Sequence, residues 1–449
     1  MKPTIAMTIG GSDPSAGAGI QADLKAFTAL DVHGVSILTC ITVQNTQTVK
    51  KIIPLPPGDI KQQIDHIVED IPIHFVKTGL LYQPEIARII AAEAKKHKWT
   101  LVVDPVLVAT SGDTLSTTNL TEEIKNTLLP VSTIITPNIP EAEALTNSSI
   151  NSTDDMKNAA KKIHTMGAKY VIIKGGHQKE KQANDLYYDG EQFIFRSLPR
   201  IPQKKAHGSG CTFSALLTGL LSKEYDVEFS FILAKAMVWN MINTGYHLGK
   251  GSDVLQITSK IANNAPYSLP TSDHVDVWMT LSRFLQDILD MLPLSFIPEV
   301  GMNIGYALQH AKSKEDICAL NGRIIRSTTK AQRCGTLQFG SSKHIASIIL
   351  AVMKTNPDIR CAMNIKYSPK NLSLCEQTSY RISSFDRTYE PKDVSSTMEW
   401  GTKTAIEQSE TCPDIIYDKG GIGKEPMIRI LGKNPEDIYT KLICILKQH

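Results

Sequence analysis

The segment 207–215, HGSGCTFSA, places two glycines and a cysteine directly before an apolar run with helical spacing. Gly208 and Gly210 let the backbone turn tightly, and the predicted helix presents unpaired N–H groups and the positive end of its dipole. Such a loop is typical of an anion site, and a phosphate whose charge grows during transfer would suit it. Cys211 stands at the mouth of this helix, where the dipole can lower the pKa of a thiol from about 8.5. The alternative is that Cys211 is a small buried apolar residue.

Polar side chains follow three predicted strands of the same half. Asn138 and Glu141 stand three residues apart in TPNIPE, a spacing suited to holding hydrated Mg²⁺ near phosphates. Lys174 closes another strand before two glycines, where its ammonium can reach a nucleotide phosphate. Asp104 ends a third strand, so it is either near the metal and the phosphates or an ordinary polar strand terminus. Each feature alone is commonly structural, but their order within one half indicates a phosphate site.

The glycine-rich stretch 10–23, GGSDPSAGAGIQAD, matches neither of the common nucleotide-binding motifs. No Gly-Lys-Ser/Thr follows it, and it does not fit G-x-G-x-x-G, so a tight strand-to-helix turn explains it equally well. The eight cysteines include no C-x-x-C pair, and the chain has no H-E-x-x-H. We therefore expect neither a zinc site nor a disulfide scaffold, and a reducing cytoplasm fits.

Composition excludes several classes of function. The 449 residues are 42% hydrophobic and 21% charged, which is ordinary for globular domains. A net charge of +3 lacks the basic excess of a nucleic-acid-binding protein. No apolar run approaches the roughly 20 residues of a membrane span, and an early glycine pair breaks the N-terminal apolar stretch that a signal peptide would need. We expect a cytoplasmic protein whose partners are small molecules, with no nucleic acid and no membrane.

The segments that must position these residues alternate between two hydrophobic patterns, one typical of buried strands and one typical of amphipathic helices. From residue 3 to about 250, short apolar runs such as IAMTI, TLVVD and KYVIIKGG alternate with amphipathic segments such as EIARIIAAEAKKH. This alternation predicts an α/β fold with a mostly parallel sheet covered by helices on both faces. Ligands of such sheets bind beyond the carboxyl ends of the strands, which is where the polar residues stand. Residues 263–273, NNAPYSLPTSD, read as a linker to a second, smaller α/β domain at 274–449.

In the second domain, cations recur beside turns. Arg323 lies in GRIIRS, and Lys343 and His344 stand in the first turn of a predicted helix that begins after Gly340. Cations in a first turn oppose the helix dipole, and a bound anion would resolve that conflict. Solvated surface charge is the alternative for each of these residues. The segments SFDR and DKGGIGK supply the further charged residues, listed in chain order: Asp386, Arg387, Asp418 and Lys424.

Residues 4 to about 255 resemble the ribokinase-like kinases, and more narrowly the hydroxymethylpyrimidine/phosphomethylpyrimidine kinases of thiamine biosynthesis. The matching stretches include GGSDPSAGAGIQADLKAF, TVQNTQTV, VKTGLL, TPNIPEA, IIKGGH and HGSGCTFSA. The resemblance implies a ribokinase-like αβα sandwich at 1–262, ATP, Mg²⁺ and two successive phosphorylations of 4-amino-5-hydroxymethyl-2-methylpyrimidine. It makes Gln44 the pyrimidine-binding residue, because a carboxamide can pair with a ring nitrogen and an exocyclic amine. Gly11 and Asp23 flank the same pocket.

The resemblance also gives the thiol a purpose. Most sugar kinases of this superfamily carry Asp where Cys211 stands, as the base that takes the hydroxyl proton. A fixed carboxylate would repel a phosphorylated acceptor, whereas a neutral or dipole-tuned thiol would not. The second acceptor is already an ionised phosphate, with a second pKa of about 6, and scarcely needs a base. We infer that Cys211 lets one site serve both acceptors.

Residues 276–449 resemble the archaeal-type thiamine-phosphate synthase domain, which occurs fused behind this same kinase. The matching stretches include GRIIRSTTKAQRCGTLQFGSSKH, STMEWGT and PDIIYDKGGIGKEPMI. The resemblance implies coupling of the pyrimidine diphosphate to thiazole phosphate with loss of pyrophosphate. That chemistry needs orientation and charge neutralisation more than a general base. We expect Arg323 and His344 to be the main catalytic pair. Lys343, Arg387 and Lys424 would bind the phosphorylated substrates, and Asp386 or Asp418 could hold Mg²⁺.

Three alternatives remain open. The first half could be a pyridoxal-type vitamin kinase, although Gln44 and Cys211 argue against it. The second half could sense thiamine phosphates without turnover, or bind its substrates after losing activity. Kinases of this type commonly form homodimers through the kinase domain, but no residue of this sequence indicates it.

Overall fold

The structure is a computed structural model. It describes residues 3–107, 119–176, 182–201, 206–257, 269, 271–391, 396–409, 411–421 and 423–448. The chain forms two compact units, residues 1–268 and 269–449, and each is described by itself. Most of the predicted linker lies outside the described residues. Its last two residues, Ser272 and Asp273, already belong to the first helix of the second unit.

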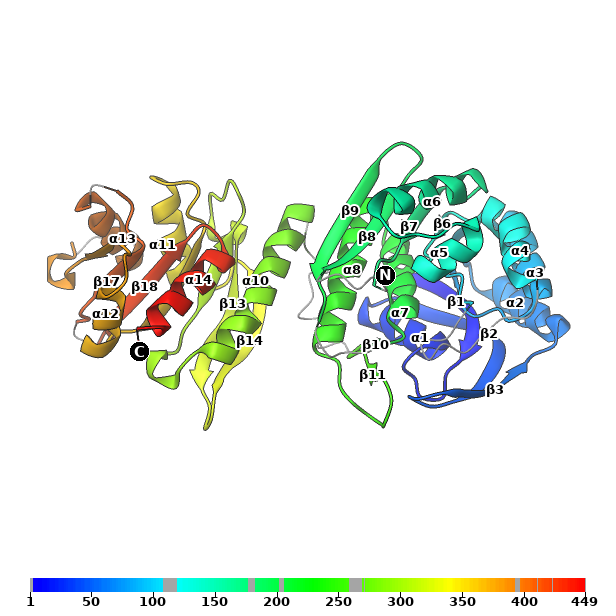
Figure 1. The fold of residues 1–449 in the computed structure, drawn as a ribbon, viewed down its shortest axis with the longest axis horizontal. Helices are drawn as coiled ribbons and strands as arrows, with labels where there is room; N and C mark the ends of the chain where they lie inside the picture. Colours follow the sequence, from blue (N-terminus) through cyan, green and yellow to red (C-terminus); the bar gives the residue numbers. More distant parts are fainter. Residues whose placement is uncertain are drawn as a thin grey trace. The chain divides into compact units, whose positions relative to one another are not determined.

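The first unit is built on a nine-stranded sheet in the order β3-β2-β1-β4-β5-β6-β7-β8-β9 (Figure 1). The strands are β1 (Ile5–Ser12), β2 (His33–Gln44), β3 (Val49–Pro54), β4 (Phe75–Thr78), β5 (Thr100–Val103), β6 (Ile134–Ile135), β7 (Tyr170–Ile173), β8 (Gln182–Tyr188) and β9 (Phe193–Pro199). The strands from β2 to β7 in this order run parallel, and β3, β8 and β9 are antiparallel to their neighbours. The predicted mostly parallel sheet is confirmed.

Helices cover both faces of this sheet. The helices are α1 (Gly19–Ala29), α2 (Pro57–Asp70), α3 (Pro84–His97), α4 (Leu120–Glu123), α5 (Ile139–Thr146), α6 (Thr153–Thr165), α7 (Ser209–Ser222) and α8 (Val227–Asn243). A short π-helical segment (Ile124–Leu128) extends α4, and the pair β10 (Ala206–His207) and β11 (Asp253–Val254) lies outside the main sheet. Helices α1, α7 and α8 pack together, and α2 to α6 bury their apolar sides in the core of the opposite face.

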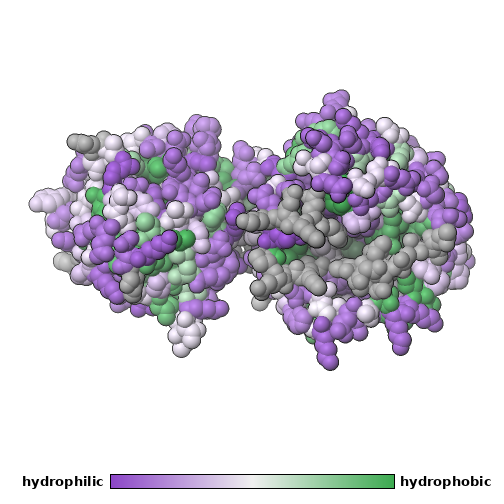
Figure 2. All heavy atoms as spheres, in the orientation of Figure 1, coloured by the Kyte–Doolittle hydropathy of each residue, from purple (hydrophilic) through white to green (hydrophobic). Residues whose placement is uncertain are grey.

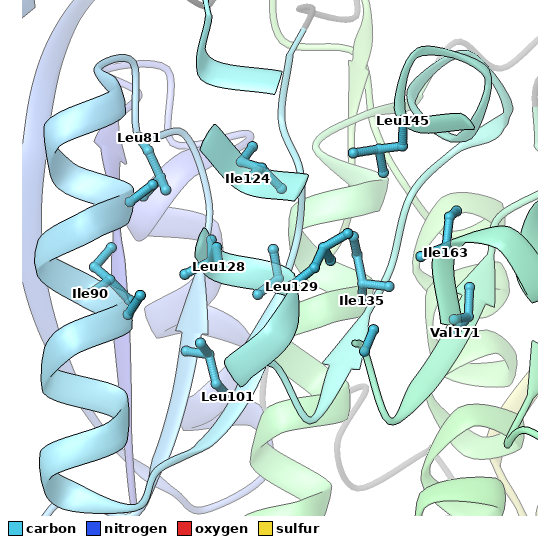
Figure 3. Packing of buried hydrophobic residues seen from close by; sticks show 14 of the residues in the cluster. Leu81, Ile90, Leu101, Ile124, Leu128, Leu129, Ile135, Leu145, Ile163 and Val171 are labelled. Carbon is cyan, nitrogen blue, oxygen red and sulfur yellow. The ribbon is translucent and has the colours of Figure 1, made fainter. Parts of the chain in front are cut away.

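The sequence of β1 and α3 shows why these layers form. Met7 and Ile9 alternate with residues of the other face and enter the core shared with α2 to α6. In α3, Ile86, Ile90 and Ala94 recur at helical spacing and are buried, with Pro84 at the first turn. Figure 3 shows Ile90 of α3 facing the strand and helix residues of this core. Each fully buried side chain of this size contributes about 1.5–3 kcal/mol.

The second unit holds a seven-stranded sheet in the order β14-β13-β12-β15-β18-β17-β16. The strands are β12 (Ile304–Ala307), β13 (Ile317–Arg326), β14 (Ala331–Phe339), β15 (Cys361–Lys366), β16 (Ile382–Ser384), β17 (Ile415–Asp418) and β18 (Met427–Gly432). The helices are α10 (Ser272–Met291), α11 (Lys343–Met353), α12 (Pro369–Glu376), α13 (Thr397–Glu407) and α14 (Pro435–Leu446). Neighbouring strands are antiparallel except β16 and β17, which are parallel. Helices α11 and α13 share one core with the sheet, and α10 packs against α14.

Hydrophilic residues cover most of the surface that Figure 2 displays, with smaller hydrophobic areas between them. Among the described helices, none combines the length and the apolar character that crossing a bilayer requires.

Candidate active sites

A cavity of about 810 Å³ opens in the first unit at the carboxyl ends of its parallel strands. All ten residues that the sequence predicts for the first site line it: Gly11, Gln44 and Asp23; Asp104, Asn138, Glu141 and Lys174; Gly208, Gly210 and Cys211. They come from strands β1 and β2, from helices α1, α5 and α7, and from the segments that follow β5, β6, β7 and β10. The fold therefore brings together residues that lie as far apart in the sequence as Gly11 and Cys211, which are separated by 200 positions.

The loop before α7 is built as an anion site. Gly208 is the N-cap of α7 with φ of +80°, and no side chain caps the helix. A Cβ at Gly208 would lie 1.8 Å from the carbonyl oxygen of Gly17, so the glycine-rich loop after β1 packs directly against this turn. Asp13 ties the two loops together, because its carboxylate accepts hydrogen bonds from the N–H of Gly17 and the N–H of Ala18 and lies 3.1 Å from His207 Nε2. The uncapped first turn of α7 lines the cavity, where its N–H groups can bind an anion.

The thiol of Cys211 is neutral at physiological pH. Burial raises its pKa to about 11, and the negative charges of Asp104 and Asp23 act in the same direction. The charge of Lys77 and the N–H of Gly19 oppose this shift but do not overcome it. Of the two possibilities that the sequence offers, a neutral thiol and a dipole-tuned one, the structure favours the neutral thiol, because desolvation outweighs the dipole. A neutral thiol adds no charge to the phosphate site.

Asn138 and Glu141 have a structural task that the sequence analysis did not foresee. The side chain of Asn138 accepts from the N–H of Glu141 at 2.9 Å, and the Glu141 carboxylate accepts from the N–H of Asn138 at 2.8 Å. This reciprocal pair is the capping box that starts α5. Burial raises the pKa of Glu141 to about 7, the charge of Lys174 lowers it, and Asp104 raises it further.

Lys174 and Asp104 form an ion pair at 2.8 Å within the same wall of the cavity. Burial lowers the pKa of Lys174, but the charges of Asp104 and Glu141 outweigh it, so the net shift is upward. Two carboxylates thus face one ammonium, and a dication would oppose the burial and the repulsion from Asp104 that together raise the pKa of Glu141. No group of three His, Cys, Asp or Glu in the described chain could hold a metal directly. The residues present therefore suit a hydrated Mg²⁺ held through water and phosphate oxygens.

The predicted pyrimidine end lies where β1 and β2 end. A Cβ at Gly11 would come within 2.8 Å of Cys40 Sγ and 3.2 Å of Leu80, so this wall requires a glycine. Asp23 is fully buried, and its carboxylate binds Lys77 Nζ at 2.8 Å and Thr8 Oγ1 at 2.6 Å. Oδ2 of Asp23 is thus engaged within the wall of the cavity, whereas Oδ1 is buried without a hydrogen-bond partner among the described residues.

Sequence reasoning missed several residues of this cavity. The sequence shows Lys77 as a charged residue within an apolar strand, but it does not reveal that Asp23 is its buried partner. Asp185 accepts from the N–H of Gly175 at 2.8 Å and pairs with Lys235 at 2.8 Å, and both side chains line the cavity. His207, which precedes Gly208 and lies 3.1 Å from the carboxylate of Asp13, also lines it.

In the second unit, the predicted cations fall into two groups. His344 lies in the first turn of α11, near three arginines: burial lowers its pKa, and the charges of Arg323, Arg429 and Arg387 lower it further. Lys424 forms an ion pair with Glu390 at 3.2 Å, and Lys343 is exposed. The structure therefore places Arg323, Arg387 and Arg429 near His344, and the sequence analysis did not select Arg429.

Neither acidic candidate of the second unit suits a metal. Both oxygens of Asp418 accept hydrogen bonds from arginines, Arg387 and Arg429. Asp386 accepts from the N–H of Thr388 and lies exposed at the start of a short 3-10 turn. The expectation that Asp418 holds Mg²⁺ is wrong, because guanidinium groups occupy its carboxylate.

Comparison with known proteins decides the family. Residues 13–256 match the family model of phosphomethylpyrimidine kinase, and residues 280–444 match that of thiamine-phosphate synthase ThiN. The chain is 34% identical over 448 residues to the bifunctional thiamine biosynthesis protein ThiDN of Methanocaldococcus jannaschii, covering 99% of this chain and 98% of that protein. The chain belongs to the ThiDN family. It is a bifunctional thiamine biosynthesis enzyme with a kinase domain followed by a synthase domain.

Relatives of the kinase domain alone are also similar to this ThiDN chain. The hydroxymethylpyrimidine/phosphomethylpyrimidine kinase of Bacillus subtilis is 42% identical over 248 residues, 55% of this chain and 92% of that protein. The pyridoxal kinase of Staphylococcus aureus in complex with ADP is 35% identical with a TM-score of 0.55, covering 58% of this chain and 95% of that one. The ADP complex of Bacillus subtilis pyridoxal kinase is 33% identical with a TM-score of 0.54, covering 58% and 99%. The predicted ribokinase-like fold of the first domain is thereby confirmed.

Proposed function

We propose that the kinase domain uses ATP to phosphorylate 4-amino-5-hydroxymethyl-2-methylpyrimidine and then its monophosphate, and that the synthase domain couples the diphosphate to hydroxyethylthiazole phosphate. The observation that supports it most strongly is that every residue predicted for the first site lines one cavity beside the uncapped start of α7. Domain limits of 1–262 and 274–449 remain our proposal for the two functional parts.

In the kinase step, Gln44 and Gly11 would hold the pyrimidine, with Asp23 fixing the wall behind it. The N–H groups at Gly208, Gly210 and the first turn of α7 would receive the transferred phosphate. Lys174 would bind a nucleotide phosphate oxygen. Because Cys211 is neutral, an acceptor that already carries a phosphate meets no fixed negative charge there. One site can then serve both acceptors.

Mg²⁺ would neutralise negative charge on the phosphate oxygens that take part in the transfer. Asp104, Glu141 and Asn138 would hold its hydration shell. Glu141 gives up its proton more readily when a cation is near, so binding and ionisation favour each other.

In the synthase step, the C–O bond to the diphosphate breaks as the thiazole nitrogen attacks with its own lone pair. Arg323 would neutralise charge on the leaving pyrophosphate, and His344 would donate a hydrogen bond to it. Lys343, Arg387 and Lys424 would bind the phosphorylated substrates. Arginine suits this task because its guanidinium binds phosphate in a bidentate manner. No general base is required.

Production of residues 270–449 alone tests the synthase proposal. The isolated domain should form thiamine phosphate from chemically prepared pyrimidine diphosphate and thiazole phosphate. Binding of both substrates without product would instead support a sensing module or a domain that has lost activity.

A pyridoxal kinase activity is the second candidate, because the solved structures with TM-scores above 0.5 reported above are pyridoxal kinases. Gln44 and Cys211 favour the aminopyrimidine. We expect kcat/KM for the aminopyrimidine to exceed that for pyridoxal by at least tenfold in parallel assays, and the reverse ratio would assign the first domain to pyridoxal.

We also propose a homodimer through the kinase domain. Ile41 and Ile53 are cross-strand partners on β2 and β3, and both are about 40% exposed at the edge of the sheet. Light scattering on the full chain should give twice the monomer mass, and Ile53→Lys should return it to one. The eight free cysteines agree with the reducing cytoplasm that we expect for this enzyme.

A further inference from the structure

Three charged side chains meet at one end of the synthase sheet. Arg387 follows β16, Asp418 ends β17, and Arg429 lies in β18. Asp418 Oδ1 accepts from Arg387 Nε at 2.6 Å, and Oδ2 accepts from Arg387 Nη2 at 3.2 Å and Arg429 Nη2 at 2.7 Å. The side chains of Arg387, Asp418 and Arg429 are 10%, 0% and 2% exposed. They form an almost buried Arg–Asp–Arg trio.

The trio carries an excess positive charge. Two guanidiniums share one carboxylate, and no other carboxylate within the described residues pairs with either of them. Arg323 adds to the positive character of this end of the sheet, and its charge, together with those of Arg387 and Arg429, lowers the pKa of His344. Arg323 forms no ion pair with a carboxylate in the part of the chain that the structure describes. A buried charge without compensation is costly, so an anion bound here would stabilise the trio.

One edge of the Arg387 guanidinium remains available to bind such an anion. Its Nε and one N–H of Nη2 are used by Asp418, and Nη1 forms no hydrogen bond to a described residue. The remaining N–H groups of Nη1 and Nη2 point away from Asp418, because the guanidinium is planar and rigid. This outer edge has the geometry that binds two phosphate oxygens.

Two further contacts hold the trio in place. The guanidinium carbons of Arg387 and Arg429 lie 5.9 and 5.3 Å from the centre of the Phe385 ring. The N–H of Gly420 donates to Asp418 Oδ1 at 2.8 Å, which ties the glycine-rich turn after β17 to the same carboxylate. The orientation of Arg387 is therefore fixed before any ligand arrives.

We propose that Asp418 is a positioning residue that holds Arg387 as a phosphate clamp for a phosphorylated substrate of the synthase domain, with Arg429 supplying additional positive charge. The inference rests on the proposed synthase reaction and deepens it. The ligand is a phosphate ester or diphosphate, and two substrates carry such groups. The experiment below distinguishes them.

The test uses the full chain without ATP, so that the kinase domain is idle, and supplies pyrimidine diphosphate and thiazole phosphate directly. Arg387→Lys keeps the charge but loses the bidentate edge, and Asp418→Asn keeps the shape but releases the arginine. We expect each change to raise the KM of one phosphorylated substrate at least tenfold while kcat falls less than threefold. The substrate whose KM rises is the one that the clamp binds. If the clamp binds the diphosphate group, the variants that raise the KM of pyrimidine diphosphate should also be inhibited less strongly by inorganic pyrophosphate.

The matched control is Arg381→Lys. Arg381 and Asp414 form the corresponding pair at the opposite ends of β16 and β17, so this change should leave both KM values within twofold of wild type. Unchanged KM values in folded Arg387→Lys would overturn the clamp, even if Asp418→Asn failed to fold. An inactive wild type would contradict the proposed function instead. The clamp would then be judged by equilibrium binding of labelled pyrophosphate, which Arg387→Lys should weaken at least tenfold and a purely structural trio would leave unchanged.

Discussion

The pKa values of Cys211 and Glu141 are both raised for the same reason, although the sequence offered one as a neutral or dipole-tuned thiol and the other as a metal carboxylate. Both stand in a wall where burial penalises a negative charge and Asp104 adds repulsion. The site therefore keeps its negative charge low until phosphates and a cation arrive. This agrees with catalysis by positioned N–H groups and cations rather than by a strong base.

At Cys211, a carboxylate should separate the two phosphorylations. Cys211→Asp places a negative charge beside the acceptor, and 1.4 kcal/mol of repulsion is a factor of about ten in rate. We expect kcat/KM for the monophosphate to fall at least tenfold more than that for the alcohol, measured in separate assays. Cys211→Ser, which is neutral, should show no such difference. Equal losses for both acceptors in Cys211→Asp would remove the charge explanation.

At Glu141, the raised pKa predicts a pH-dependent stability. An acid with a pKa of about 7 in the folded chain and 4.5 as its ordinary value binds its proton more tightly when folded. Its contribution to stability is therefore present at low pH and is lost as pH rises from about 4.5 to about 7. Without ligands, the unfolding temperature of the kinase domain should fall over this range more steeply in wild type than in Glu141→Gln, which keeps the capping box. Identical slopes in scanning calorimetry would contradict the raised pKa.

At the scale of elements, the turn between β10 and α7 determines the phosphate site. Gly208 has a left-handed backbone and touches Gly17 of the neighbouring loop, so neither loop can move independently. The sequence motif shows the glycine, but only the fold shows which backbone lies against it.

Gly208→Ala should therefore disable the kinase while leaving the synthase domain active. A Cβ 1.8 Å from the Gly17 oxygen displaces one of the two loops, and a shift of about 1 Å in a positioned group can cost roughly a hundredfold in rate. Gly58→Ala in α2 is the matched control, because its Cβ would meet no atom within 4 Å. Kinase rates near wild type for Gly208→Ala would show that the turn tolerates a side chain.

The order of strands and helices in the kinase domain was predictable, because apolar runs of two periods alternate and polar residues mark the strand ends. The pattern N-x-x-E was ambiguous, because the same spacing can form a capping box or supply a pair of oxygen ligands. In this structure Asn138 and Glu141 form the capping box directly. Partners such as Asp23 with Lys77, or Asp418 with Arg429, could not be predicted. They depend on strand register, which the sequence of a single chain does not reveal.

At the scale of the whole molecule, the two compact units give each reaction its own core. A kinase whose product is the substrate of the attached synthase gains from a raised local concentration, without any need for a channel. Diffusion of the kinase product to the attached synthase domain is therefore enough to explain the fusion.

Separation of the two units should therefore preserve both chemistries. A protease site inserted at position 263 and then cleaved should leave each initial rate within about twofold, as expected for domains with their own cores. The coupled rate from the unphosphorylated pyrimidine should fall only while the diphosphate remains below its KM. Loss of either activity on cleavage, assayed against an uncleaved sample, would show that the units depend on each other.

The most direct test of the account is the stoichiometry of the full chain supplied with aminopyrimidine, ATP, Mg²⁺ and thiazole phosphate. Two ADP and one pyrophosphate should appear for each thiamine phosphate formed. In Arg323→Gln, ADP should still form and the pyrimidine diphosphate should accumulate. An absence of thiamine phosphate from the wild type, or a product yield in Arg323→Gln equal to that of the wild type, would contradict the account.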